Sequence, residues 1–198
     1  MKVVLASSSP ARLRTLRDAG IIPEVRVSNV DEEAVVAALP ADTGFPQQVM
    51  ALARAKAHAV AVNPEEIVIG ADSMLEVGGH LVGKPHSAEV ARQRIREMVE
   101  PGMRTVLHTG HCVRLQQREM VACSHAEVFF APITEAEIDA YVATGEPLEV
   151  AGSFTIDGRG GAFVESIAGD YHGVVGLSLP LLRKMCSEIG VFWPDLWN

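Results

Sequence analysis

The stretch "EIVIGAD", residues 66–72, indicates the fold class more clearly than any other part of the chain. It is short and apolar, which is typical of a buried strand. Because Asp72 ends the run, we expect its carboxylate at the carboxyl edge of a sheet, where the ligand sites of α/β proteins gather. An acid at that edge can bind a divalent cation or activate water. The alternative is an aspartate that caps the turn before Ser73.

Helices and strands alternate along the rest of the sequence. We expect strands at residues 3–6 and 24–28, a hairpin turning at Gly78-Gly79, and two long strands joined by a polar turn near residues 116–119. Spacing and capping residues predict helices at residues 12–19, 46–62, 87–99, 134–143 and 181–189. Residues 145–178 are rich in glycine and are expected to be irregular. The hairpins imply antiparallel pairs, so the predicted fold class is α/β with a mixed sheet.

Composition narrows the class of protein. With 198 residues and 48% hydrophobic content, the chain can bury a sizeable core, in one large domain or in two lobes that share a cleft. The formal net charge of -8 argues against general nucleic-acid binding, which needs a basic surface. No apolar run approaches the roughly 20 residues that span a bilayer, so no membrane association is expected. The three cysteines show neither metal-ligand nor disulfide spacing, which favours a reducing cytoplasm.

The stretch "LASSSPARLRTLRDAG", residues 5–20, joins the first predicted strand to the first helix. Ser9 and Pro10 form a good helix start, because serine caps an orphan N–H group and proline fits the first helical position. This layout directs backbone N–H groups and the positive end of the helix dipole outward, which suits an anion. Arg12 adds a guanidinium fork that matches phosphate oxygens. An ordinary capped helix with solvated arginines explains the stretch equally well.

Two lysines stand where the chain can direct their side chains. Helical spacing places Lys56 on the apolar face of the helix at residues 46–62. A lysine on such a face either snorkels outward or reaches an anion. Lys84 lies between Gly83 and Pro85, which either fix the backbone to aim the side chain or form a plain surface turn.

Two polar segments offer further chemistry. The acidic run at residues 31–33 follows the strand at residues 24–28, and it is either a solvated loop or the source of a second carboxylate for a shared Mg²⁺ site. The segment "VAGSFTIDGRGG", residues 150–161, combines backbone freedom with Asp157 and Arg159. It is either a base-recognition loop or a flexible connection.

Taken together and in their order, these motifs resemble the Maf family. The motifs are "LASSSPARLRTL", "VDEEA", "LARAKAHAV", "VIGADSMLEVGGHLVGKPHSAEVARQRIREM", "RTVLHTGHCV" and "GEPLEVAGSFTIDGRGGAFVESIAGDYHGVVGLSLPLL". The match covers nearly the whole chain, so residues 1–198 are expected to form a single Maf-like domain. The resemblance implies a mixed α/β fold related to the inosine triphosphate pyrophosphatases, with two lobes around a central cleft. It also implies hydrolysis of nucleoside triphosphates to the monophosphate and pyrophosphate with a divalent metal, Mg²⁺ or Mn²⁺.

The resemblance assigns roles to six residues of this chain. The positions that would bind the substrate's phosphates are Ser9, Arg12, Lys56 and Lys84. Glu32 and Asp72 match the acids that would hold the metal. Asp72 is also the predicted catalytic residue, which would activate water either as a general base or through the metal.

Three positions depart from the commonest family pattern. Ala11 stands where many members have the first arginine of "SPRR", and Ser73 stands where they have threonine after the aspartate. Asp157 stands at the glutamine of "AYGIQG". The resemblance associates these positions with the choice of nucleobase, so no particular base is assigned to this chain.

The resemblance therefore implies a nucleoside triphosphate pyrophosphatase, a hydrolase that removes non-canonical or excess nucleotides, and we expect it in the cytoplasm. The alternative is a nucleotide-binding regulator that acts through a protein partner in cell division, since members of the family carry an older label as septum-formation inhibitors. A homodimer is compatible with the sequence, which does not fix the oligomeric state. The sequence also leaves open the physiological nucleotide.

Overall fold

The computed structural model describes residues 1–198, which divide into two compact units. The first unit contains Met1–Asp72, Thr109–Ser124 and Gly176–Asn198, and the second contains Ser73–His108 and His125–Val175. The single domain with a cleft shared by two lobes stays a prediction. No helix combines the length and the apolar character that crossing a membrane requires.

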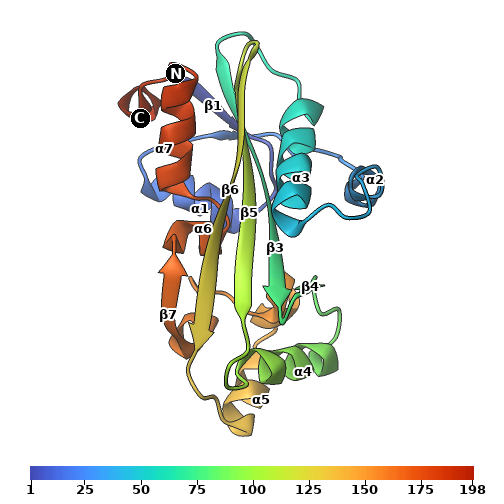
Figure 1. The fold of residues 1–198 in the computed structure, drawn as a ribbon. Helices are drawn as coiled ribbons and strands as arrows, with labels where there is room; N and C mark the ends of the chain where they lie inside the picture. The colour runs from blue at the N-terminus through green and yellow to red at the C-terminus, as the bar shows by residue number, and fades with distance from the viewer. The chain divides into compact units, whose positions relative to one another are not determined.

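Seven strands form one mixed sheet in the order β2-β1-β3-β5-β6-β7, with β4 paired to β3 (Figure 1). The strands are β1 (Lys2–Leu5), β2 (Glu24–Val25), β3 (Glu66–Val77), β4 (His80–Val82), β5 (Thr105–Leu115), β6 (Arg118–Phe130) and β7 (Val164–Gly169). The α-helices are α1 (Pro10–Asp18), α2 (Glu32–Ala37), α3 (Phe45–Ala59), α4 (Ala88–Met98), α5 (Glu135–Ala143), α6 (Tyr171–Val175) and α7 (Leu179–Glu188). The 3-10 helices are η1 (Glu146–Leu148), η2 (Ala151–Ser153), η3 (Arg159–Phe163) and η4 (Trp193–Leu196). Parallel pairs join β1 to β2 and β3, and antiparallel pairs join β3 to β4 and β6 to β7, which confirms the predicted mixed α/β class.

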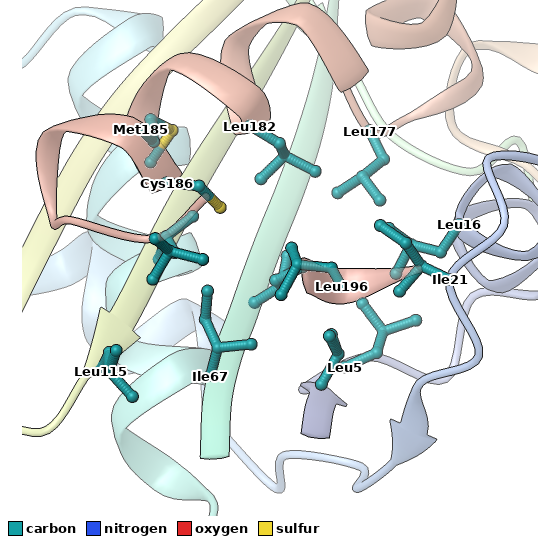
Figure 2. Packing of buried hydrophobic residues seen from close by; sticks show 14 of the residues in the cluster. Leu5, Leu16, Ile21, Ile67, Leu115, Leu177, Leu182, Met185, Cys186 and Leu196 are labelled. Atoms are coloured by element: carbon teal, nitrogen blue, oxygen red, sulfur yellow. The ribbon is translucent and has the colours of Figure 1, made fainter. Parts of the chain in front are cut away.

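In the first unit, alternate residues of the strands pack into two different cores. Leu5 and Ile67 lie in a cluster closed by residues of α1 and α7 (Figure 2). Val4 and Val68 lie in another cluster, with Ala53 of α3. Because successive side chains of a strand point to opposite faces, this part of the sheet is covered on both sides. The first residues of β3 form a continuous apolar run because neither face of the strand meets water there.

Two glycines allow α3 to lie directly on the strands. A Cβ on Gly70 would lie 2.8 Å from the backbone nitrogen of Ala57, and a Cβ on Gly110 would lie 2.7 Å from that of Met50. A side chain is not accommodated so close to backbone atoms, so these two positions require glycine. The helix that carries Lys56 therefore approaches β3 and β5 as closely as two backbones can.

The second unit is organised around the hairpin of β3 and β4. Gly78 and Gly79 have φ values of +56° and +87°, the left-handed values of a tight hairpin turn, and Val77 pairs with His80. Ser87 caps α4, and α5 begins with the predicted capping box. Both helices contribute to the apolar core of this unit. The local signals that predicted the hairpin and the two helix starts are confirmed.

The extent of β3 differs from the prediction. Asp72 does not end the strand, which continues to Val77. The neighbouring strand β1 ends at Leu5, which is opposite Ile69. Asp72 therefore lies past the carboxyl end of β1 but inside β3. The prediction of a strand end was wrong because the chain stays extended to form the hairpin with β4.

Three other segments differ from the prediction. The strand expected at residues 24–28 has only two residues, because it lies at the edge of the sheet, where Val25 and Val27 are exposed. The acidic run at residues 31–33 is not a loop, since Asp31 caps α2. The region expected to be irregular contains β7, whose residues are mostly exposed at the other edge of the sheet and so lack strand alternation.

A network of four charged residues ties the edge of the sheet together in the first unit. Arg26 makes a two-pronged ion pair with Glu66, at 2.7 Å and 2.9 Å, and donates from Nε to Glu24 at 2.7 Å. Lys2 contacts both carboxylates, at 2.6 Å and 3.1 Å. The side chain of Glu66 is only 4% exposed. These partners lower the pKa of Glu24 to about 2 and hold the pKa of Glu66 well below its ordinary value, with Arg26 the main cause for both.

We expect this network to make the protein acid-sensitive. A carboxylate with a lowered pKa in the folded state stabilises the fold above the unfolded pKa of about 4.5, and this contribution is lost as the pH falls toward the folded value of about 2. Glu66→Gln should therefore be less stable than the wild type near neutral pH, and the gap between the two proteins should narrow steadily as the pH falls below 4.5 toward the strongly lowered folded pKa of Glu66. Urea midpoints measured across this range test the expectation. A constant gap between the two curves at all pH values would contradict it.

Candidate functional site

The register of β3 sets the position of the candidate site in the first unit. Val68 lies on the side of the strand that α3 covers, and alternation places Gly70 and Asp72 on the same side. Lys56 of α3 reaches Asp72 there, with its Nζ atom 2.5 Å from Oδ1. The side chains of Lys56 and Asp72 are 12% and 10% exposed. Lys56 therefore does not snorkel into solvent; it reaches an anion, which in this structure is a carboxylate of the protein itself.

A second carboxylate reaches the same lysine from α2. Asp31 starts this helix by accepting from the N–H of Ala34 at 3.0 Å, and α2 packs against α3. Glu32, the first residue of α2, lies with Oε1 2.7 Å from Nζ of Lys56. The structure thus brings Glu32, Lys56 and Asp72 together, as three of the residues that the resemblance singled out.

The turn before α1 follows the predicted capping pattern. Ser9 caps the helix by accepting from the N–H of Arg12 at 3.4 Å, and Pro10 occupies the first helical position. The N–H of Ser9 donates to Oγ of Ser7 at 3.2 Å, so the serines also brace one another. These two hydrogen bonds order the turn without any contribution from a ligand.

Arg12 is buried, unlike the solvated arginine of the alternative interpretation. Its Nη1 donates to the carbonyl of Ala71 at 2.8 Å and to Oγ of Ser7 at 3.2 Å. Its Nε donates to the carbonyl of Gly176 at 2.9 Å. Arg12 thus connects the start of α1 with the residue directly before Asp72. The sequence did not predict these backbone acceptors.

Burial and charge act in opposite directions on the ionisable groups of this site. Burial raises the pKa of Asp72, while Lys56 and Arg12 act to lower it. Burial lowers the pKa of Arg12, and the charges of Asp72 and Glu32 oppose that shift. Arg12, Lys56 and Asp72 therefore share one poorly solvated place, where their interactions are stronger than at the surface, whereas the side chain of Glu32 is 55% exposed.

The oxygen donors of Glu32 and Asp72 are of the type that binds Mg²⁺ or Mn²⁺. Glu32 and Asp72 already share one cation, the ammonium group of Lys56. No group of three or more His, Cys, Asp or Glu residues that could hold a metal exists in the chain. Mg²⁺ is commonly bound through one or two carboxylates, water and substrate phosphates, so Glu32 and Asp72 could take part in such a site, and the metal stays a prediction.

The remaining predicted residues are placed as follows. Ala11 lies in α1 of the first unit, and Ser73 lies on β3 at the start of the second unit. Lys84 is exposed in the turn that follows β4, and Asp157 lies between η2 and η3; both belong to the second unit. The turn at Lys84 is not an unrestrained surface turn, because the carbonyl of Gly83 accepts from Arg94 and from the N–H of Gly152. The roles of these residues in substrate binding stay predictions.

A family profile described as Maf-like protein matches residues 2–189. The chain belongs to the Maf family. The match spans nearly the entire sequence, so the resemblance drawn from the separate motifs is confirmed. The catalytic, metal-binding and phosphate-binding roles of individual residues stay predictions.

Curated relatives cover this member of the Maf family from end to end. One from Nocardia farcinica is 53% identical over 206 residues, covering 99% of this chain and 96% of its own. Others from Streptomyces coelicolor and Saccharopolyspora erythraea are 49% and 50% identical, covering 99% and 100% of this chain and 94% and 98% of their own. All three carry the name nucleoside triphosphate pyrophosphatase. Among solved structures, a Staphylococcus aureus Ham1 protein covers 66% of this chain and 72% of its own, with 16% identity and a TM-score of 0.38, which is too weak a likeness to support an argument.

Proposed function

We propose that this chain is a nucleoside triphosphate pyrophosphatase, which converts a nucleoside triphosphate to the monophosphate and pyrophosphate. The observation that carries the proposal is the contact of one ammonium group, on Lys56, with both Glu32 and Asp72 beside the buried Arg12. The names of relatives at about half identity support the same activity. Removal of non-canonical or excess nucleotides in the cytoplasm is the biological role that we propose for it.

The residues of the site would divide the chemistry as follows. Asp72 would take a proton from the water that attacks the α-phosphorus, as the bond from that phosphorus to the pyrophosphate oxygen breaks. Lys56, Arg12 and Lys84 would stabilise the negative charge on the phosphate oxygens, and Ser9 would present the N-terminal turn of α1 to them. Glu32 and Asp72 would hold Mg²⁺ or Mn²⁺, which neutralises phosphate charge when bound. In this arrangement substrate or metal would replace part of the ion pairing that Lys56 makes within the protein.

Pyrophosphate release by the purified protein tests the proposal. The protein is incubated with Mg²⁺ or Mn²⁺ and a panel of canonical and modified nucleoside triphosphates, and pyrophosphate and monophosphate are quantified. We expect release in equal amounts from at least one nucleotide and its loss in EDTA. Undiminished turnover in EDTA would exclude the role of the metal. Nucleotide binding without any release would favour the regulator over the enzyme.

We also expect the three departures from the family pattern to affect the choice of nucleobase. Ala11 removes a long cation near the N-terminal turn, and an ionised Asp157 can only accept hydrogen bonds, whereas glutamine both donates and accepts. An acceptor favours bases that present amino or imino hydrogens and disfavours bases that present only carbonyl oxygens. Asp157→Gln and Ala11→Arg, alone and together, should therefore reorder the nucleotides when they are ranked by kcat/KM. The same ranking in all variants would show that these positions do not read the base.

A further inference from the structure

Glu146 organises a loop of the second unit, although nothing in the sequence marked it as a site residue. It is the first residue of η1, and its side chain is 17% exposed. Its carboxylate accepts from the backbone N–H groups of Gly160 and Arg159, at 3.1 Å and 3.2 Å. It also accepts from Oγ1 of Thr155. One side chain therefore binds both ends of the segment at residues 155–160.

The segment is packed too tightly to be a flexible connection. The hydroxyl oxygen of Tyr141 accepts from the N–H of Thr155 at 3.2 Å. A Cβ on Gly158 would lie 2.8 Å from Oε1 of Glu146, and a Cβ on Gly160 would lie 2.5 Å from the hydroxyl of Tyr141. The glycines thus serve close packing around Glu146 and Tyr141, and the interpretation of this segment as a flexible connection was wrong.

The position of Asp157 gives this order a consequence for binding. Asp157 lies between Thr155 and Arg159, so the contacts of Glu146 fix the backbone on both sides of it. A ligand that meets a fixed loop does not have to order it, and the entropic cost of binding is correspondingly lower. A carboxylate on a fixed backbone also discriminates better than one on a mobile loop, because a mismatched group cannot be avoided by a movement of the loop.

We propose that Glu146 is a positioning residue for substrate discrimination, which holds the segment at residues 155–160 so that Asp157 meets the edge of the nucleobase. The inference rests on the proposed hydrolysis of nucleoside triphosphates. Glu146 itself makes no contact with the base; it acts through Thr155 and the backbone of the segment. The favoured nucleobases are those whose edge presents amino or imino hydrogens to a carboxylate.

The substitution Glu146→Gln tests this role. The amide keeps the size of the side chain but turns an NH₂ group toward N–H and O–H donors, so at least one contact with the segment is lost. We measure kcat and KM for a panel of nucleoside triphosphates and, separately, the dissociation constants of their non-hydrolysable analogues. The ratio between the best and the worst nucleotide should fall by about tenfold, through a higher KM and a weaker affinity for the best one.

Two comparisons test whether the change in the ratio is specific to Glu146 and depends on Asp157. Glu149→Gln changes an exposed glutamate three residues along the chain and should leave the ratio as in the wild type. In an Asp157→Ala background, Glu146→Gln should have no further effect on the ratio, because the group that it positions is gone. If Glu146→Gln unfolds the protein, Thr155→Val removes one of the same contacts with little change in shape, and it should lower the ratio in the same direction.

The outcomes separate this inference from the proposed function. An active wild type whose ratio is unchanged by both Glu146→Gln and Thr155→Val would overturn the role of Glu146 alone. A uniform loss for all nucleotides would do the same, because it would indicate a purely structural role. A wild type that releases no pyrophosphate would overturn the proposed function, while the dissociation constants of the analogues would still decide whether Glu146 affects discrimination.

Discussion

Asp72→Asn is expected to lower kcat for pyrophosphate release by about 10²-fold or more, the scale on which a positioned general base contributes. Asparagine keeps the shape of the side chain but cannot take a proton from water, and it removes one of the two carboxylates that contact Lys56. Steady-state kinetics over a range of metal concentrations would measure the loss. Substrate affinity should change less than kcat, because the phosphate-binding cations remain.

A matched control for this prediction lies in α5. Asp139 is paired with Arg92 through its Oδ1 at 2.6 Å, and its side chain is 61% exposed. Asp139→Asn should therefore retain the wild-type rate, since exposed ion pairs contribute little and neither Asp139 nor Arg92 is a predicted site residue. A near wild-type rate for Asp72→Asn as well would show that Asp72 only neutralises Lys56 in the fold.

The sequence predicted the face on which Lys56 lies but not its contact with Asp72. The helical period places Lys56 on the apolar side of α3, and the strand period places Asp72 on the side of β3 to which Val68 belongs. Each period can be read from a single segment of sequence. Both faces of β3 are apolar and buried, so only the structure shows that α3 covers the face on which Asp72 lies.

The partners of Arg12 could not be predicted either. Its acceptors are the carbonyls of Ala71 and Gly176, which are backbone groups far away in the sequence. Every residue type has a backbone carbonyl, so the sequence does not show which carbonyls accept from Arg12. It is therefore equally compatible with an exposed and a buried arginine. The length of β3 was misjudged for a related reason, because Asp72 resembles a strand end although the extended chain continues.

Glu146 shows a third limit of sequence analysis. Glutamates are usually exposed, and nothing in the spacing of "GEPLEV" separates Glu146 from Glu149. The distinction arises only when the chain folds back and presents the N–H groups of Gly160 and Arg159 to one of the two carboxylates. The glycines of the segment did signal an unusual backbone, but the sequence could not tell close packing from flexibility.

Gly110→Ala is expected to lower the free energy of unfolding by at least about 3 kcal/mol, the upper range for added volume in a tightly packed core. The new Cβ would overlap the carbonyl group of Val49 and lie 2.7 Å from the backbone nitrogen of Met50. These are backbone atoms of α3, which cannot rotate away as a side chain can. The helix would have to move off the sheet as a unit, and the core that includes Val4 would lose its cover.

This substitution also couples the fold to the site, because α3 carries Lys56. Under conditions in which Gly110→Ala stays folded, the displaced helix should hold Lys56 farther from Asp72, so activity should fall more than the folded fraction does. Urea unfolding and kinetics on the same samples separate the two effects. Gly83→Ala is the control for stability, since a Cβ at Gly83 would meet no atom within 4 Å. If Gly110→Ala matched Gly83→Ala in stability, α3 would not lie on β5 at backbone contact, and the close approach that we hold responsible for the pairing of Lys56 with Asp72 would have to be abandoned.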